Sequence, residues 1–167
     1  YAQFVAARAD LVQRLPAGIS DAEGAMVEPL AVGHHVVSRA QLPHAASVLV
    51  LGGGPIGAAV TLFTRSTGAR HVVVSEPASA RRDRCLSLGA TATIDPHAED
   101  VAARFAALTG GAPQVVFECV GVPGMLHDAV GLAAIRGRVV VAGVVFAEDR
   151  FMPLPAMTKE VSIVFSS

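Results

Sequence analysis

The chain has 167 residues, of which 52% are hydrophobic and 16% charged, and its formal net charge at pH 7 is −1. This balance suits one domain with a sheet buried on both faces, and it excludes a strongly basic surface for nucleic acid or an anionic membrane. The longest apolar stretch, residues 48–63, is interrupted by glycines and Pro55, so it cannot span a bilayer, and without a signal-peptide pattern we expect a cytoplasmic protein.

The N-terminal stretch belongs to no alternating unit of strand and helix. Residues 1–15 predict one or two short strands, around residues 4–5 and 11–12, which end at a proline and a glycine. A helix is then predicted to begin after Ser20, because Ser20 and Glu23 have the spacing of a capping box.

This first helix contains a proline near its start. We expect it to continue, after an adjustment near Pro29, to about Arg39.

From residue 47 onward, short apolar strands alternate with helices. This alternation predicts parallel strands joined by crossover helices, and six of them complete a doubly wound α/β sheet in the order 3-2-1-4-5-6. The expected strands are 47–51, 71–75, 91–94, 114–119, 138–144 and 160–165, and the expected helices are 55–66, 78–88, 98–108 and 125–135.

A glycine-rich loop connects the first of these strands to its helix. Its sequence, Gly52-Gly53-Gly54-Pro55-Ile56-Gly57, matches the pattern GxGxxG of the Rossmann dinucleotide fold. In that pattern Gly52 makes the tight turn, Gly54 lets the backbone approach a pyrophosphate, and Gly57 lets the helix pack closely on the sheet. The helix N-terminus offers free N–H groups to the phosphates. The alternative is a turn that needs glycines only for its own geometry.

An acid follows the second strand, as this cofactor site requires. Glu76 lies 19 residues after Gly57, where a carboxylate can accept hydrogen bonds from the ribose hydroxyls of adenosine. It would repel a 2′-phosphate, so NAD is favoured over NADP. Arg81 and Arg82 could receive such a phosphate, but they also fit a solvated helix face. The alternative for Glu76 is an exposed acid at a strand end.

Two other ligand classes use similar loops and remain minor alternatives. Methyltransferases that bind S-adenosylmethionine usually carry an acid just before the first glycine, where this chain has Val48-Leu49-Val50-Leu51. FAD domains usually begin almost at the chain terminus, whereas 46 residues precede this strand.

Five segments in the expected order resemble the medium-chain zinc-dependent dehydrogenases, especially the branch of polyol, threonine and butanediol dehydrogenases. They are Glu28-Pro29-Leu30-Ala31-Val32-Gly33, the glycine loop, Ser75-Glu76-Pro77 with Arg81, Val116-Phe117-Glu118-Cys119-Val120-Gly121 and Val140-Val141-Ala142-Gly143-Val144. The resemblance implies an enzyme of two domains. Residues 1–19 would be a remnant of its catalytic, GroES-like β domain, and residues 20–167 its NAD-binding Rossmann domain.

The resemblance also implies roles for individual residues. Gly52, Gly54, Pro55, Ile56, Gly57, Glu76 and Arg81 would bind the cofactor, with Arg81 flanking the adenosine, and the strand ends Val120-Gly121 and Ala142-Gly143-Val144 would line the nicotinamide. Glu28 aligns with a position that contributes a ligand, or a near-ligand, to the catalytic zinc. The family's zinc-binding Cys and His-Glu pair are missing here, and one ligand cannot hold zinc, so no catalytic residue is assigned.

Five further residues invite functional interpretations. His34 and His35 point about 100° apart on a helix, so we favour packing or surface roles over a shared metal. Cys85 lies beside several arginines, which would favour a thiolate, and Cys119 is expected to be a small buried hydrophobe. The two cysteines have no disulfide or zinc spacing. Glu118, inside an apolar strand, needs a partner that the sequence does not identify.

These features predict the cofactor-binding half of a zinc-dependent oxidoreductase, which transfers a hydride between NAD and a secondary alcohol or diol. The fragment alone is expected to be inactive, and zinc is expected in the full-length parent. The alternative is a nucleotide-binding module without catalysis, such as a redox sensor or regulator. Expected partners are the small alcohol or ketone substrate and a second copy of the chain, joined through the apolar last strand at the sheet edge.

Overall fold

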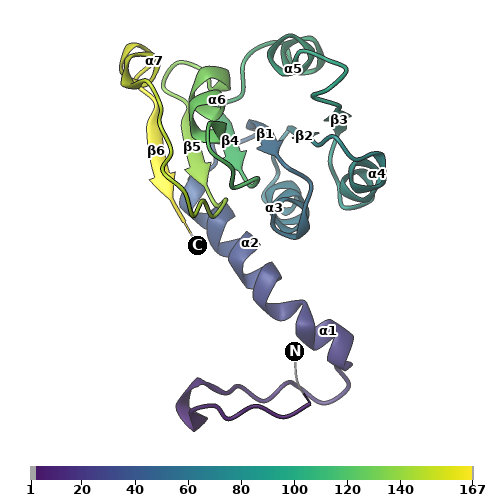
Figure 1. Ribbon diagram of the computed structural model, residues 1–167. Coiled ribbons are helices and arrows are strands. Elements are labelled where there is room, and N and C mark those ends of the chain that lie inside the picture. The colour runs from purple at the N-terminus through teal and green to yellow at the C-terminus, as the bar shows by residue number, and fades with distance from the viewer. Residues whose placement is uncertain (1–2, 167) are drawn as a thin grey trace.

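The computed structural model describes residues 3–166, in which the chain forms one doubly wound parallel sheet flanked by helices (Figure 1). The strand order is β3-β2-β1-β4-β5-β6, as the sequence predicts, and all five pairings are parallel. The strands are β1 (Ser47–Leu51), β2 (His71–Ser75), β3 (Ala92–Ile94), β4 (Val115–Glu118), β5 (Arg138–Val141) and β6 (Ser162–Phe165). The helices are α1 (Asp21–Ala25), α2 (Val27–Ala40), α3 (Pro55–Ser66), α4 (Ser79–Ser87), α5 (Val101–Thr109), α6 (Met125–Leu132) and α7 (Pro153–Thr158).

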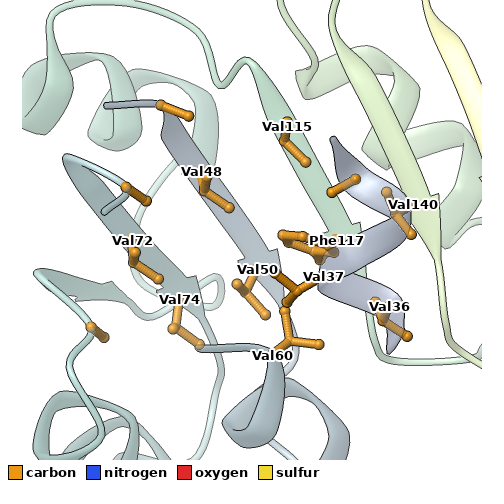
Figure 2. Close-up of a cluster of buried hydrophobic side chains, with 14 of the residues drawn as sticks. Val36, Val37, Val48, Val50, Val60, Val72, Val74, Val115, Phe117 and Val140 are labelled. Atoms are coloured by element: carbon orange, nitrogen blue, oxygen red, sulfur yellow. The ribbon is translucent and has the colours of Figure 1, made fainter. Parts of the chain in front are cut away.

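The core lies on both faces of the sheet because successive strand residues point to opposite sides. On one face, Val48 and Val50 of β1 pack with Phe117 of β4 and with valines of α2 and α3 (Figure 2). On the other face, Leu49 belongs to a second cluster that includes Phe105 of α5. Burying each such side chain contributes about 1.5–3 kcal/mol, so the two apolar layers hold the strand ends in fixed positions.

The predicted N-terminal helix is divided into α1 and α2 at Met26. The capping box is confirmed: the Ser20 hydroxyl accepts from the N–H of Glu23 at 3.3 Å, and the Glu23 carboxyl accepts from the N–H of Ser20 at 2.8 Å. The break comes three residues before Pro29, which has no N–H to donate to the preceding turn. A proline in the first turn of a helix costs little, so α2 can begin at Val27, two residues before Pro29.

The long helix α2 is held mainly by its C-terminal half. Val36 and Val37 are buried in the core, and the Arg138 guanidinium of β5 donates to the Ala40 carbonyl at 3.1 Å and to the Gln41 side chain at 2.8 Å. Positive charge at a helix C-terminus is favourable. The N-terminal half of α2 extends beyond the sheet (Figure 1).

The predicted N-terminal strands are wrong for the described residues. Residues 3–20 form no strand and contain one 3₁₀ turn, Ala9–Leu11. Phe4 and Val5 are 91% and 86% exposed, in a segment that lies away from the sheet (Figure 1). A strand requires a neighbouring strand to pair with, and the described part of the chain offers none here.

Several boundaries also differ from the prediction. β5 ends at Val141 and not at residue 144, because the N–H groups of Ala142 and Gly143 both turn to the Glu118 carbonyl. Helix α7, which begins at Pro153, was not predicted, although proline suits the first turn of a helix. None of the helices described within residues 3–166 is long and apolar enough to cross a membrane.

Candidate functional site

A cleft of about 570 Å³ opens at the carboxyl ends of β1, β2 and β4. Doubly wound sheets bind their ligands at this edge, where the strand order reverses. Six predicted cofactor residues line the cleft: Gly52, Gly54, Pro55, Glu76, Arg81 and Val120. The fold therefore brings the glycine loop and the acid after β2 to one place.

The fold requires glycine at some positions of the loop and not at others, for different structural reasons. Gly52 has a φ of +91°, which favours glycine. At Gly57 a Cβ would collide with the main-chain carbonyl oxygen of Gly52, so the first turn of α3 packs directly on the end of β1. At Gly54 a Cβ would meet nothing within 4 Å, and its φ of −68° suits any residue. The fold thus requires glycine at Gly52 and Gly57, while Gly54 leaves an open approach to its backbone.

The buried carboxyl group of Glu76 is hydrogen-bonded to the backbone of the glycine loop. It is only 3% exposed, and its carboxyl oxygens accept from the N–H of Gly53 at 2.7 Å and of Ala78 at 2.9 Å. The alternative of an exposed acid at a strand end is therefore wrong. Each carboxyl oxygen keeps a further lone pair for a ligand.

The two arginines after Glu76 are both drawn toward acids. Arg81 Nη1 lies 3.8 Å from the Glu76 carboxyl. Arg82 pairs with Asp95 at 3.0 Å and donates to the carbonyls of Glu76 and Pro77 at 2.8 and 2.6 Å. Arg82 therefore links the end of β2 to the loop after β3, and its side chain is not simply solvated.

The cleft is also lined by residues that were not predicted from the sequence. Pro96 and His97 line it from the loop after β3, and Met125 and Asp128 line it from α6. Their signal was available: Pro96 and His97 come within three residues of the end of a parallel strand, so they lie at the same edge as the glycine loop.

The strand ends predicted to line a nicotinamide are divided between neighbouring pockets. Val120 lines the main cleft, whereas Ala142, Gly143 and Val144 line a second pocket of about 480 Å³. Gly121 contacts the latter turn, since its Cβ would lie 2.8 Å from the Val144 nitrogen. Ile56, in contrast, is half-buried against the core and does not line the cleft.

The described residues do not fit a zinc site. Glu28 is exposed near the free end of α2, and no group of three His, Cys, Asp or Glu side chains within residues 3–166 lies close enough to hold a metal ion. His34 packs edge-on against Phe63, with ring centroids 5.2 Å apart, and His35 lines the second pocket. The two histidines thus have separate surroundings, as their spacing predicts.

The thiolate interpretation of Cys85 is wrong. Its thiol is fully buried beneath the glycine loop, and burial is the main reason that the pKa of Cys85 is raised. Arg84, the neighbouring arginine whose charge favours the thiolate, is exposed, and its effect is smaller than that of burial. Burial, and secondly the adjacent Glu118, also raise the pKa of the partly buried Cys119.

Comparison with known proteins was made for sequence and structure. A family model described as zinc-binding dehydrogenase matches residues 55–167. The 2-dehydro-3-deoxy-L-galactonate 5-dehydrogenase of Pseudoalteromonas atlantica is 40% identical over 139 residues, covering 82% of this chain and 40% of that protein. The sorbitol dehydrogenase of Mus musculus is 32% identical over 165 residues, covering 96% of this chain and 46% of that protein. The chain thus spans less than half the length of these relatives.

Solved structures agree in fold. The 2R,3R-butanediol dehydrogenase of Bacillus subtilis superimposes with a TM-score of 0.82 at 32% identity, over 92% of this chain and 44% of that one. A Sinorhizobium meliloti 1021 protein bound to NADP superimposes with a TM-score of 0.83 at 33% identity, over 90% of this chain and 46% of that one.

Proposed function

We propose, from the premise that this chain belongs to the zinc-binding dehydrogenase family, that it is the cofactor-binding half of an NAD-dependent alcohol or polyol dehydrogenase. The observation that carries the proposal is the pairing of Gly54 and Glu76 in one cleft. The backbone of Gly54 is open to a pyrophosphate, and Glu76 lies beside it with acceptor capacity for the hydroxyls of the adenosine ribose.

The preference for NAD over NADP is proposed from charge. A 2′-phosphate on the adenosine ribose would meet the Glu76 carboxyl, and burying two like charges together is unfavourable. Arg82 is already engaged by Asp95 and two carbonyls, and Arg81 faces Glu76. These contacts leave little unpaired positive charge for a phosphate, although a relative of this chain has been solved with NADP.

The substrate class is proposed from the relatives. Sorbitol and butanediol dehydrogenases are among them, so we propose that the whole protein transfers a hydride between NAD and a secondary alcohol or diol. Residues 1–19 would then belong to the catalytic domain and residues 20–167 to the NAD-binding domain, of which residues 1, 2 and 167 lie outside the described chain. In the family zinc supplies a Lewis acid, and within residues 3–166 no group of three His, Cys, Asp or Glu side chains could hold it. We therefore expect no diol oxidation by the 167-residue chain.

A direct titration tests the proposal. The purified chain should bind NADH saturably, with enhanced nicotinamide fluorescence, and should bind NADPH at least about tenfold more weakly because of the charge at Glu76. ADP should compete with NADH, because it carries the ribose and pyrophosphate that the cleft recognises. A chain that binds NADPH more tightly than NADH, or neither nucleotide, would contradict the proposal. Binding without turnover even when the missing domain is supplied would favour the alternative, a redox sensor or regulator.

We also propose that a second copy of the chain pairs with β6, which among the described residues has β5 as its single neighbouring strand. The N–H groups of Ser162 and Ser166 point to β5, so those of Ile163 and Phe165 face the open edge. Ile163 packs against the core, so a lysine there would disturb the fold itself, whereas Phe165 is 68% exposed.

A substitution at Phe165 separates pairing from folding. Phe165→Pro removes an N–H from the open edge, where proline is tolerated, and should shift the chain from dimer to monomer in sedimentation velocity. The control Ser162→Ala leaves the edge backbone intact and should remain dimeric. Wild-type chain that sediments as a monomer at high concentration would show that this edge does not pair.

A further inference from the structure

Glu118, the last residue of β4, receives four N–H groups from two turns. It is 1% exposed, and its Oε1 atom accepts from the N–H of Val120 at 2.6 Å and of Gly121 at 2.9 Å. Its main-chain carbonyl accepts from the N–H of Ala142 at 2.8 Å and of Gly143 at 2.9 Å. One residue therefore holds together the turn after β4 and the turn after β5.

The two turns also pack so closely that neither Gly121 nor Gly143 has room for a side chain. Gly121 has a φ of +74°, and a Cβ there would lie 2.8 Å from both the nitrogen and the oxygen of Val144. At Gly143 a Cβ would collide with the Gly121 nitrogen and with the second Glu118 carboxyl oxygen. Because main chain meets main chain, a shift of the Glu118 carboxyl displaces both turns together.

These turns lie on the far side of the glycine loop from Glu76. Val120 lines the main cleft, and the turn after β5 lines the second pocket. A dinucleotide with its adenosine ribose at Glu76 and its pyrophosphate at Gly54 continues toward them. We infer that Glu118 is a positioning residue, which sets the backbone that receives the nicotinamide half of the cofactor while making no contact with the adenosine half. This inference rests on the proposed function.

Comparing the affinities for NADH and for ADP distinguishes the two halves of the cofactor site, because ADP lacks the nicotinamide half. Glu118→Asp keeps the charge but withdraws the carboxyl by one methylene, about 1.5 Å, so it can no longer reach both N–H groups. We expect the Kd for NADH to rise about tenfold, while the Kd for ADP stays within about twofold. Glu118→Gln keeps an acceptor at the same reach and should stay within about threefold of wild type for both ligands.

A second variant covers the case in which Glu118→Asp does not fold, as judged by circular dichroism. Gly143→Ala should push the two turns apart and produce the same selective loss of NADH. The inference is overturned if these variants change both affinities by the same factor, if neither affinity changes, or if Glu118→Gln is as weak as Glu118→Asp. It is also overturned if wild type binds NADH no more tightly than ADP. Wild type that binds no ADP refutes the proposed function itself.

Discussion

Gly57→Ala is expected to destabilise the folded chain by about 3 kcal/mol or more, at the upper end of the cost of overpacking. The added methyl group would collide with the carbonyl oxygen of Gly52, which is main chain and cannot rotate away. Thermal unfolding followed by circular dichroism should show a fall in Tm of roughly 6–12 °C for a domain of this size.

Gly54→Ala is the matched control for this prediction. The two glycines lie three residues apart in the same loop, but a methyl group at Gly54 would meet no protein atom within 4 Å. Its Tm should therefore stay within about 1 °C of wild type, while NADH binding weakens because the methyl group occupies the approach to the pyrophosphate. Equal losses of Tm in the two variants would show that the open space at Gly54 has a structural role and is not reserved for a ligand.

Glu76→Ala should weaken NADH binding by about 10- to 150-fold, since it removes charge-assisted hydrogen bonds worth roughly 1.5–3 kcal/mol. Removing the acid also removes its repulsion of a 2′-phosphate, so NADPH should lose much less affinity and the preference for NADH should largely disappear. Parallel fluorescence titrations with both nucleotides measure this ratio.

Glu76→Ala also leaves the N–H of Gly53 without its partner, so a loss of stability is expected as well. Glu76→Gln distinguishes the two effects because it retains an acceptor for Gly53 but has no charge. It should keep most of the stability while still losing preference for NADH. An unchanged ratio of NADH to NADPH affinity in both variants would contradict the role of Glu76 in cofactor choice.

The features that could be predicted from sequence depend on neighbours along the chain. The order of the six strands follows from their alternation with helices, and the close contact at Gly57 follows from the spacing of the loop. The capping box needs only Ser20 and its third neighbour. For Gly57 and for the capping box a short segment contains both the group and its partner, whereas the strand order follows from the general topology of doubly wound sheets.

The features that were missed depend on partners distant in sequence. Phe4-Val5 has strand propensity but no strand to pair with among the described residues. Cys85 has arginines as chain neighbours, yet its helix turns it inward beneath a loop about 30 positions earlier in the chain, where burial outweighs their charge. The partners of Glu118 include the turn after β5, which only the assembled sheet brings near.

Helix α2 is packed into the core along its C-terminal half, and its N-terminal half projects beyond the sheet (Figure 1). Its C-terminal end is fixed by the buried Val36 and Val37 and by Arg138, whereas Glu28, near its other end, is exposed. Its 14 residues give a length of roughly 21 Å. Gly33 is also buried, close against Ala59 of α3, so only the six residues before it, roughly 9 Å, can tilt without disturbing the core, and a tilt of about 10° there moves the free end by about 1.5 Å. A small bend beside Gly33 thus moves Glu28 by a distance comparable to the margin that makes or breaks a hydrogen bond.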